Sequence, residues 1–435
     1  MITRREFTAL AGVALGAPSV LLEACGGSSP TAATPAPKST APANMQMIWW
    51  GNADRAKRTE KVIAQFGQKY PQYRITDTWG PNSSYFDKLN TQIASGSPPD
   101  VFQMDMKYLA TYTQKGVLLD LARYGSDILD LSDFDPNLLK EVKTRNGTFG
   151  LPSALNMFAM LHNTTVIDKA GGTPPGSDLT WQQFADWCLA LARVLPKGTW
   201  AVDDFSGAIN AFEGWVHSLG LELYSGAGKL GYPKQVVLDW FNYWSNLRKA
   251  GGVVPADVSA AASNASSQSA STIATGKAAT FMTHSNFLEQ YQPLTKDKLA
   301  IGPYPRAKRP GIYPKVSQLW CVSAKTKYPS QAVQFLSFYT NDPDAQKAVG
   351  VERGAPPALK ARTLIAPLLT PEQKAELDYV SQFSKGTTAR TSLDPAGALD
   401  VTNALSQAAQ SIGLAGTSVQ AATDKFWSDA NQALQ

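Results

Sequence analysis

Residues 47–104 have the sequence MIWWGNADRAKRTEKVIAQFGQKYPQYRITDTWGPNSSYFDKLNTQIASGSPPDVFQM and alternate strand-like with helix-like segments. The apolar run 47–50 predicts a buried strand, and the apolar positions within 59–66 follow it at helical spacing. Strand-like runs return at 73–79 and 101–104, with another amphipathic segment between them. Such alternation predicts an α/β fold with a parallel sheet layered by helices.

Helical patterns continue through the rest of the chain. Thr180 and Gln183 form a capping box before an apolar stripe, which predicts a helix over 181–195. Further helices are predicted over 234–249, 330–340 and 371–383. The sequence shows no internal repeat.

The N-terminus has the features of an export signal. The pair Arg4-Arg5 precedes an uncharged stretch, 7–22, that is too short to span a bilayer comfortably. Residues 22–26, Leu-Glu-Ala-Cys-Gly, resemble a bacterial lipobox in which the thiol of Cys25 is acylated, and residues 3–7 resemble a twin-arginine export motif. We expect a signal peptide over 1–24; the alternatives are an ordinary cleaved signal or a buried helix.

Residues 25–44 are almost wholly Gly, Ser, Thr, Ala and Pro, with Lys38 as the only charge. This composition predicts a disordered spacer between the anchor and the folded part. Beyond Asn44 the chain is too long for one hydrophobic core, which predicts two lobes. The net charge of +5 is scattered, so nucleic acid is a poor candidate partner.

Two cysteines remain when Cys25 is assigned to lipid. Cys188 falls on a helix-like apolar stripe and Cys321 in a strand-like run. One disulfide between them is possible in an oxidising compartment, but buried free thiols fit this pattern better.

Sequence signatures of catalysis are scarce. The three histidines stand at no metal-ligand spacing, and we find neither a nucleophile elbow nor a phosphate-binding loop, so no metal and no cofactor are expected. A glycosidase needs only two carboxylates from any positions in the chain. The residues that could supply such a pair are Asp54, Asp105, Glu213 and Glu352, although a ligand-binding or structural role is more common for each.

The chain contains 11 tryptophans, several beside polar residues. Trp50, Trp215 and Trp320 stand next to polar or acidic positions, whereas Trp187, Trp240 and Trp244 lie on helical stripes and are expected in the core. A sugar offers an apolar face for an aromatic ring and a rim of hydroxyls for polar side chains. The combination therefore favours carbohydrate as the ligand.

An ordered series of motifs resembles extracellular solute-binding protein family 1, the sugar-binding components of ABC importers that include maltose-binding protein. The series begins with the strand and helix of 48–71 and with residues 85–101, which include Ser-Gly-Ser-Pro-Pro-Asp. It continues with the segments 147–152, 168–171, 274–282, 330–336 and 354–357. Together the matching segments extend from Met45 to about Leu359.

The resemblance implies a two-lobed periplasmic-binding-protein-like fold of type II, with a ligand cleft between lobes joined by hinge crossovers. Lobe 1 would comprise 45–152 and 299–341, and lobe 2 would comprise 153–298 and 342–435. It also implies a monomeric, non-enzymatic receptor that closes on a sugar or oligosaccharide and delivers it to ABC permease subunits. Such a receptor works at the outer face of the cytoplasmic membrane, held there by its lipid.

The resemblance also suggests ligand contacts. Polar contacts are expected after the first strand and at later strand ends, and an acidic-aromatic pair is expected in lobe 2. Together with Trp50, the expected ligand-binding residues are Asn52, Asp54, Arg55, Asp105, Asn156, Glu213, Trp215, Ser285, Phe287, Trp320 and Arg353. Two rival functions remain open: an exported carbohydrate-active enzyme, and a lipid-anchored envelope adhesion module.

Overall fold

A computed structural model describes residues 36–144, 147–265, 267–384 and 394–435. Cys25 and the predicted export signal lie outside these residues. The predicted alternation near the N-terminus is confirmed. Its elements are β1 (Ala43–Trp50), α1 (Ala53–Lys69), β2 (Tyr73–Gly80), α2 (Asn82–Ala94), β3 (Val101–Met104) and α3 (Met106–Gln114).

One mixed sheet runs through the molecule, with the strand order β2-β1-β3-β10-β6-β8-β7 and with β9 paired to β6. β1 is parallel to both β2 and β3, so Met47 lies opposite Asp77 on one side and Val101 on the other. Parallel neighbours require crossover connections, which α1 and α2 supply. β10 (Pro314–Val322) then joins β3 in the antiparallel sense.

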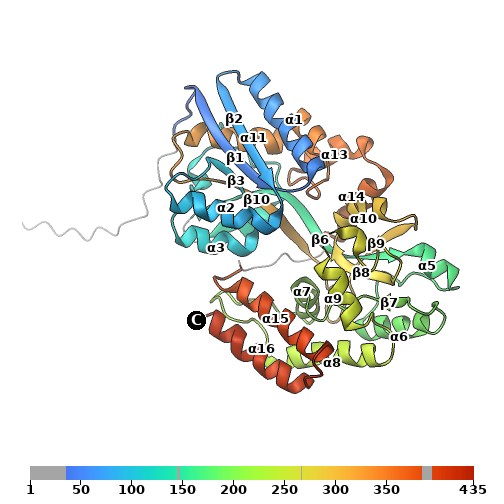
Figure 1. Cartoon of the computed structure of the whole chain (residues 1–435). Coiled ribbons are helices and arrows are strands. Elements are labelled where there is room, and N and C mark those ends of the chain that lie inside the picture. The colour runs from blue at the N-terminus through green and yellow to red at the C-terminus, as the bar shows by residue number, and fades with distance from the viewer. Residues whose placement is uncertain (1–35, 145–146, 266, 385–393) are drawn as a thin grey trace, which may run out of the picture. The chain divides into compact units, whose positions relative to one another are not determined.

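The longest strand, β6 (Leu151–Asn163), connects the two parts of this sheet. Its first half pairs with β10, and its second half pairs with β8 (Ala278–His284) and β9 (Leu299–Gly302). All 13 of its residues are buried, because neighbouring elements cover both faces. Figure 1 shows β6 and β10 running from the β1–β3 side toward the side that carries β7 (Trp200–Val202) and β8.

Helices cover the sheet on both sides. α6 (Trp181–Ala192) begins at the predicted Thr180–Gln183 capping box, and α8 (Lys234–Lys249) has the predicted bounds. The other helices are α4 (Pro136–Val142), α5 (Thr164–Lys169), α7 (Ile209–Ser218), α9 (Ala256–Asn264), α10 (Phe287–Tyr291), α11 (Pro329–Asn341), α12 (Pro343–Val349), α13 (Leu359–Ile365), α14 (Pro371–Phe383), α15 (Ala398–Gly413) and α16 (Val419–Ala433). Short strands β4 (Lys143–Thr144) and β5 (Gly147–Thr148) form a separate pair, and the 3-10 turns are η1 (Leu121–Arg123), η2 (Gln268–Ala270), η3 (Gln292–Leu294) and η4 (Ala366–Leu368).

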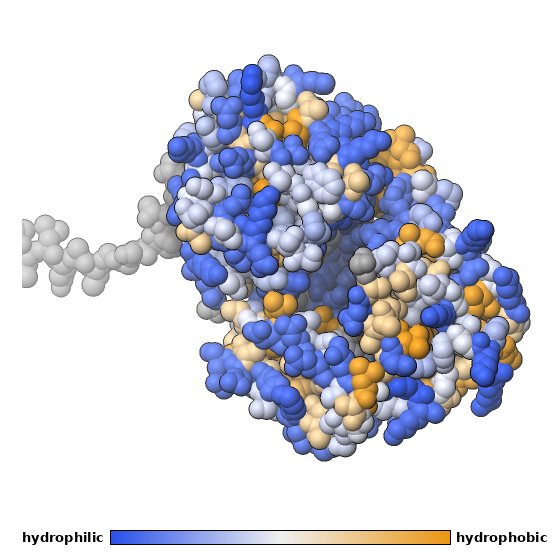
Figure 2. Space-filling view, in the orientation of Figure 1, coloured by the Kyte–Doolittle hydropathy of each residue, from blue (hydrophilic) through white to orange (hydrophobic). Residues whose placement is uncertain are grey.

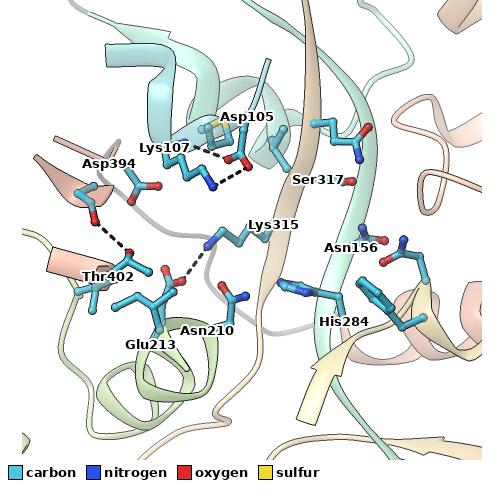
Figure 3. Close-up of a pocket in the computed structure, with 18 of the residues that line it drawn as sticks. Asp105, Lys107, Asn156, Asn210, Glu213, His284, Lys315, Ser317, Asp394 and Thr402 are labelled. Atoms are coloured by element: carbon cyan, nitrogen blue, oxygen red, sulfur yellow. Dashed lines mark hydrogen bonds and ion pairs between the residues drawn. The ribbon is translucent and has the colours of Figure 1, made fainter. Parts of the chain in front are cut away.

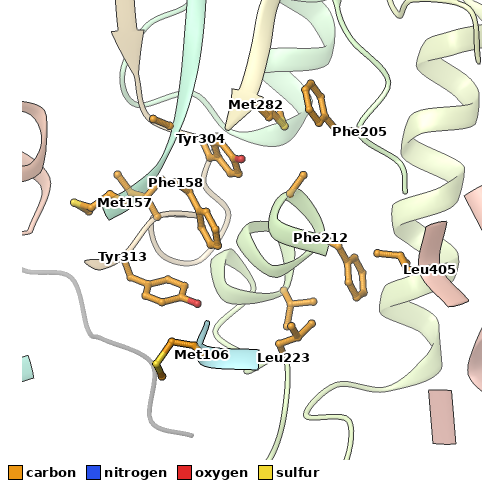
Figure 4. Close-up of a cluster of buried hydrophobic side chains, with 14 of the residues drawn as sticks. Met106, Met157, Phe158, Phe205, Phe212, Leu223, Met282, Tyr304, Tyr313 and Leu405 are labelled. Carbon is orange, nitrogen blue, oxygen red and sulfur yellow. The ribbon is translucent and has the colours of Figure 1, made fainter. Parts of the chain in front are cut away.

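An aromatic cluster fills the core around the middle of β6. Phe158 stacks on Tyr304 with ring centroids 5.5 Å apart and meets Tyr313 edge-on at the same distance. Figure 4 shows Phe212, Leu223 and other apolar side chains gathered in this cluster. Offset and edge-on ring pairs add stabilisation beyond the area they bury, so the cluster stabilises the middle of β6.

The last part of the segment predicted as a disordered spacer, 25–44, belongs to the folded body. Residues 36–42 contact the folded body: the Ser39 amide donates to Ser330 Oγ at 2.9 Å, and Gln331 Nε2 donates to the Ala41 carbonyl at 3.1 Å. β1 then begins at Ala43. Small and polar residues cannot build a core of their own, but their backbone groups can still bind to one.

The lobe boundaries remain a proposal, and the contacts favour changing them at two places. β9, assigned above to lobe 1, pairs with residues 160–163 of β6, which were assigned to lobe 2. α12, assigned to lobe 2, packs on α1, and Asp342 before it accepts a hydrogen bond from Lys69 at 2.8 Å. The preferred state of the two cysteines is confirmed, because Cys188 and Cys321 are both buried free thiols.

Candidate ligand cleft

A cavity of about 380 Å³ opens where the carboxyl ends of β1 and β3 face α7, α10 and α15. Figure 2 shows the molecule hollowed between its two lobes. β6 and β10 form the floor of this cleft, because Asn156, Lys315 and Ser317 line it from these strands. The remaining lining residues are Trp50, Arg55, Asp105, Met106, Lys107, Ile209, Asn210, Glu213, Leu223, Tyr224, His284, Asn286, Phe287, Gln290, Val316, Gln318, Asp394, Ala398 and Thr402.

Aromatic rings border the cleft on both sides. Trp50, the last residue of β1, is 7 % exposed and packs edge-on against Tyr85, with ring centroids 5.0 Å apart. Phe287, at the start of α10 after β8, lines the cleft from the other part of the sheet. Among the described residues, Trp50 is the only tryptophan that lines the cleft.

Asp105 begins α3 directly after β3. Its Oδ1 accepts a hydrogen bond from the Lys107 amide at 3.2 Å, and Lys107 Nζ lies 3.6 Å from its Oδ2. Both side chains are partly exposed to the cleft (Figure 3). The position follows from the fold, because the carboxyl ends of parallel strands meet at one edge of the sheet and ligands bind there.

Glu213 and Lys315 form an ion pair across the cleft floor. Glu213 lies on α7 and is 3 % exposed, and its Oε2 accepts from Lys315 Nζ at 2.7 Å. Tyr313 also donates its hydroxyl to Glu213. Lys315 Nζ is 5.4 Å from the centre of the Phe158 ring, which gives the ammonium a second favourable contact. Figure 3 shows this lysine extending from β10 into the cleft.

His284 lies beside this pair at the end of β8. Burial and the positive charge of Lys315 lower the pKa of His284 to about 4, and the charge of Glu213 opposes the shift. The imidazole is therefore neutral at neutral pH. A neutral imidazole can both donate and accept a hydrogen bond, which suits a hydroxyl-rich ligand.

Amide and hydroxyl groups supply the rest of the polar lining. Asn156 is 6 % exposed, donates from Nδ2 to the Arg353 carbonyl at 3.3 Å, and accepts from Ser285 Oγ at 3.5 Å. Asn286 Oδ1 is buried and has no hydrogen-bond partner among the described residues. A buried polar atom is normally paired, so Asn286 is a natural contact for a bound molecule.

The structure brings half of the predicted site residues to the cleft. Those that line it are Trp50, Arg55, Asp105, Asn156, Glu213 and Phe287. The others lie elsewhere: Asn52 caps α1 by accepting from the Arg55 amide at 2.9 Å, and Asp54 pairs with Arg58 at 2.8 Å on the surface of that helix. That any of them binds a ligand remains a prediction.

The remaining predicted residues are held inside the protein. Trp215 is partly buried and packs against Trp181 and Trp240, with ring centroids 5.1 and 5.6 Å away, at the edge of the core beside α6 and α8. Ser285 is 1 % exposed, and Trp320 is fully buried. Arg353 is 1 % exposed and lies 5.0 Å from the Trp320 ring centre. Glu213 and Trp215 are close in the sequence, but a helix places residues two apart on different faces, so Trp215 does not line the cleft beside Glu213.

Several lining residues carried no recognisable signal in the sequence. They are Lys107, Asn210, His284, Gln290, Lys315, Gln318, Asp394 and Thr402. Lys315 illustrates the reason. It lies in a strand where neighbours alternate between the two faces, and only the paired strands determine which face borders the cleft.

The described residues contain neither a metal-binding cluster nor a membrane-spanning helix. No three His, Cys, Asp or Glu side chains cluster closely enough to hold a metal ion. No helix in the described part has both the length and the apolar character needed to cross a bilayer.

Comparison with known proteins identifies a family that matches this chain. The model of a family described as bacterial extracellular solute-binding protein matches residues 61–376. The chain belongs to this family. A solved family 1 solute-binding protein from Alicyclobacillus acidocaldarius subsp. acidocaldarius DSM 446 is 30 % identical, with 91 % of this chain and 100 % of that one covered and a TM-score of 0.71. The predicted family and its two-lobed α/β fold are confirmed.

Two further relatives are more distant. An oligogalacturonide-binding protein from Yersinia enterocolitica, solved with saturated digalacturonic acid, is 21 % identical, with a TM-score of 0.78 and coverage of 90 % of this chain and 98 % of that one. The lipoprotein LipO of Bacillus subtilis strain 168 is 26 % identical over 178 residues, or 40 % of this solute-binding protein. That alignment spans 32 % of LipO, about a third of its length.

Proposed function

We propose that this solute-binding protein is the receptor of an ABC importer for a sugar or oligosaccharide, and that a lipid on Cys25 holds it at the outer face of the cytoplasmic membrane. The observation that carries the proposal is the cleft itself, where Trp50 and Phe287 border opposite sides and amides, hydroxyls and ion pairs line the space between. Rings and directed polar groups together fit the two chemically different surfaces of a sugar.

The relatives support this ligand class. The Yersinia protein was solved with an oligosaccharide, and an ABC substrate-binding protein from Listeria monocytogenes was solved with cycloalternan; the latter is 17 % identical with a TM-score of 0.77 and coverage of 90 % and 99 %. Binding without bond making is sufficient for a receptor, and we propose that this chain does not catalyse a reaction. The carboxylates that line the cleft, Asp105, Glu213 and Asp394, would then serve as structural partners or as hydrogen-bond acceptors for the ligand.

A thermal-shift screen tests the proposal. The panel contains monosaccharides, oligosaccharides, polyols and glycerol phosphodiesters, and a ligand at 100 times its Kd stabilises the native state by about 2.7 kcal/mol. We expect a saccharide to raise the Tm of the protein, with calorimetry on the Trp50→Leu variant showing weaker binding. Trp79→Leu is the matched control, because Trp79 is 41 % exposed and does not line the cleft.

Three results would contradict parts of this proposal. If no saccharide shifts the Tm, the ligand class is wrong. If a labelled oligosaccharide is turned over, the protein is an exported enzyme and the Asp105 and Glu213 carboxylates become candidates for its acid and base. Mass spectrometry of the protein from its membrane fraction tests the anchor separately, and an unacylated Cys25 would make the receptor freely diffusing.

A further inference from the structure

Residues 352–354, Glu-Arg-Gly, lie behind the cleft floor. Glu352 is 8 % exposed and Arg353 is 1 % exposed, and neither lines the cavity. Charged side chains are rarely buried this completely unless they are paired and hydrogen-bonded. Their partners show what this segment does.

The guanidinium of Arg353 binds three elements at once. It donates from Nη1 to Gln318 Oε1 at 3.0 Å on β10, from Nη2 to Thr59 Oγ1 at 3.1 Å on α1, and from Nε to Tyr339 Oη at 3.0 Å on α11. A planar fork with fixed donor directions holds its partners in one geometry. Of these partners, Gln318 lines the cleft.

The backbone of the same segment holds two more cleft residues. The Arg353 carbonyl accepts from Ser317 Oγ at 2.8 Å and from Asn156 Nδ2 at 3.3 Å. Gly354 has a φ of +122°, and a Cβ there would lie 2.2 Å from Asn156 Oδ1. Only glycine permits this conformation and this close approach.

Glu352 orients Arg55, a charged residue of α1 that lines the cleft. Arg55 Nε lies 2.8 Å from Glu352 Oε1 and 3.0 Å from Oε2. Burial and the nearby charge of Arg353 lower the pKa of Arg55, and the carboxylate of Glu352 opposes the shift. Without this carboxylate, the Arg55 guanidinium would be a buried and uncompensated charge.

We propose that residues 352–354 form a buttress that positions Arg55, Asn156, Ser317 and Gln318 for ligand binding, with Arg353 as its central positioning residue. The part of this inference that concerns ligand binding rests on the proposed function. Preorganised polar groups bind more tightly because they lose less rotational freedom when the ligand arrives. Removing the buttress therefore weakens binding without removing any ligand contact.

The first test compares Arg353→Met with Arg362→Met. Arg362 is a matched control, since its side chain is 12 % exposed and it binds the Pro356 carbonyl at 2.7 Å, yet it does not line the cleft. Crystal structures of both ligand-free variants are the primary measurement. We expect Gln318, which loses the hydrogen bond from the Arg353 guanidinium, to change rotamer in Arg353→Met and to keep its position in Arg362→Met. An unchanged Gln318 in Arg353→Met would overturn the proposal.

Calorimetry with maltotriose and with digalacturonic acid provides the second measurement. We expect Arg353→Met to weaken the binding of whichever probe the wild-type protein binds by at least tenfold, Arg362→Met by less than twofold, and Arg353→Lys to recover part of the loss. Equal losses in the two methionine variants would refute a positioning role. If the wild-type protein binds neither probe, the proposed ligand class loses its support, whereas the crystal structures still decide the buttress.

Gly354→Ala supplies a variant that keeps Arg353. Its control is Gly416→Ala, because Gly416 has a φ of +69° and nothing lies within 4 Å of its Cβ position. We expect Gly354→Ala to displace Asn156 in the crystal structure, and Gly416→Ala to leave the cleft unchanged. An undisturbed Asn156 in Gly354→Ala would show that the buttress does not set its position.

Discussion

Replacing one partner of the Glu213–Lys315 ion pair should destabilise the protein, and replacing both should cost less than the sum of the single changes. The Glu213 side chain is 4 % exposed and the Lys315 side chain is 18 % exposed, with 2.7 Å between Nζ and Oε2. Breaking a fully buried pair costs about 3–5 kcal/mol, because a charge is left without compensation. Lys315 can still reach water in the cleft, so we expect Glu213→Gln to cost about 2 kcal/mol.

A double-mutant cycle isolates the interaction from everything else that Glu213 contacts. The variants are Glu213→Gln, Lys315→Met and the double substitution, and the assay is urea unfolding followed by tryptophan fluorescence. We expect a coupling free energy of about 1–3 kcal/mol, the range for contacting residues in one network. A coupling below about 0.5 kcal/mol, as found for independent sites, would refute the idea that this pair organises the cleft floor.

Three further predictions follow from the same structure. Trp50→Leu should weaken saccharide binding at least tenfold in calorimetry, whereas Asp54→Ala, at a surface position outside the cleft, should change it less than twofold. Burial lowers the pKa of all three histidines to about 4, so the unfolded chain takes up protons before the folded protein does as the pH falls from about 6.5. The free energy of unfolding should therefore fall by up to about 2 kcal/mol per histidine by pH 5. His284→Asn should reduce the slope of this fall with pH. Burial raises the pKa of Glu376 well above its usual value, so its ionisation costs stability as the pH rises above about 4.5; Glu376→Gln should therefore stabilise the protein more at pH 8 than at pH 5 in urea unfolding.

The sequence predicted the fold well because hydrophobic periodicity indicates where strands and helices form. The strands and helices of 47–104 and the Thr180–Gln183 capping box come from local chemistry, which needs no tertiary information. The pairing of β6 with β10 and β8 was not visible, because β6 is buried on both faces and its sequence carries no alternation or pattern specific to its partners.

The cleft was predicted less completely, for a physical reason. Residues at strand ends, such as Trp50 and Asp105, could be placed because parallel strands present their carboxyl ends at one edge. Arg353 was predicted at the rim of the cleft, but it is buried behind the floor, since a rim residue and a buried support look identical in a sequence. Their difference lies in burial, and burial depends on α1 and α11, which are hundreds of residues apart in the chain.

Residues on the cleft floor and residues on its sides suggest how ligand binding and closure are coupled. Asn156 and Lys315 lie on β6 and β10, the strands that pass between the two parts of the sheet, while Trp50 and Phe287 border opposite sides. A ligand that touched only the floor would bind the open and closed forms equally. A ligand with equal affinity for two states does not change their populations. Under the proposed function, closure therefore requires a ligand that contacts residues on both sides of this floor, so the width of the cleft limits how short an effective saccharide can be.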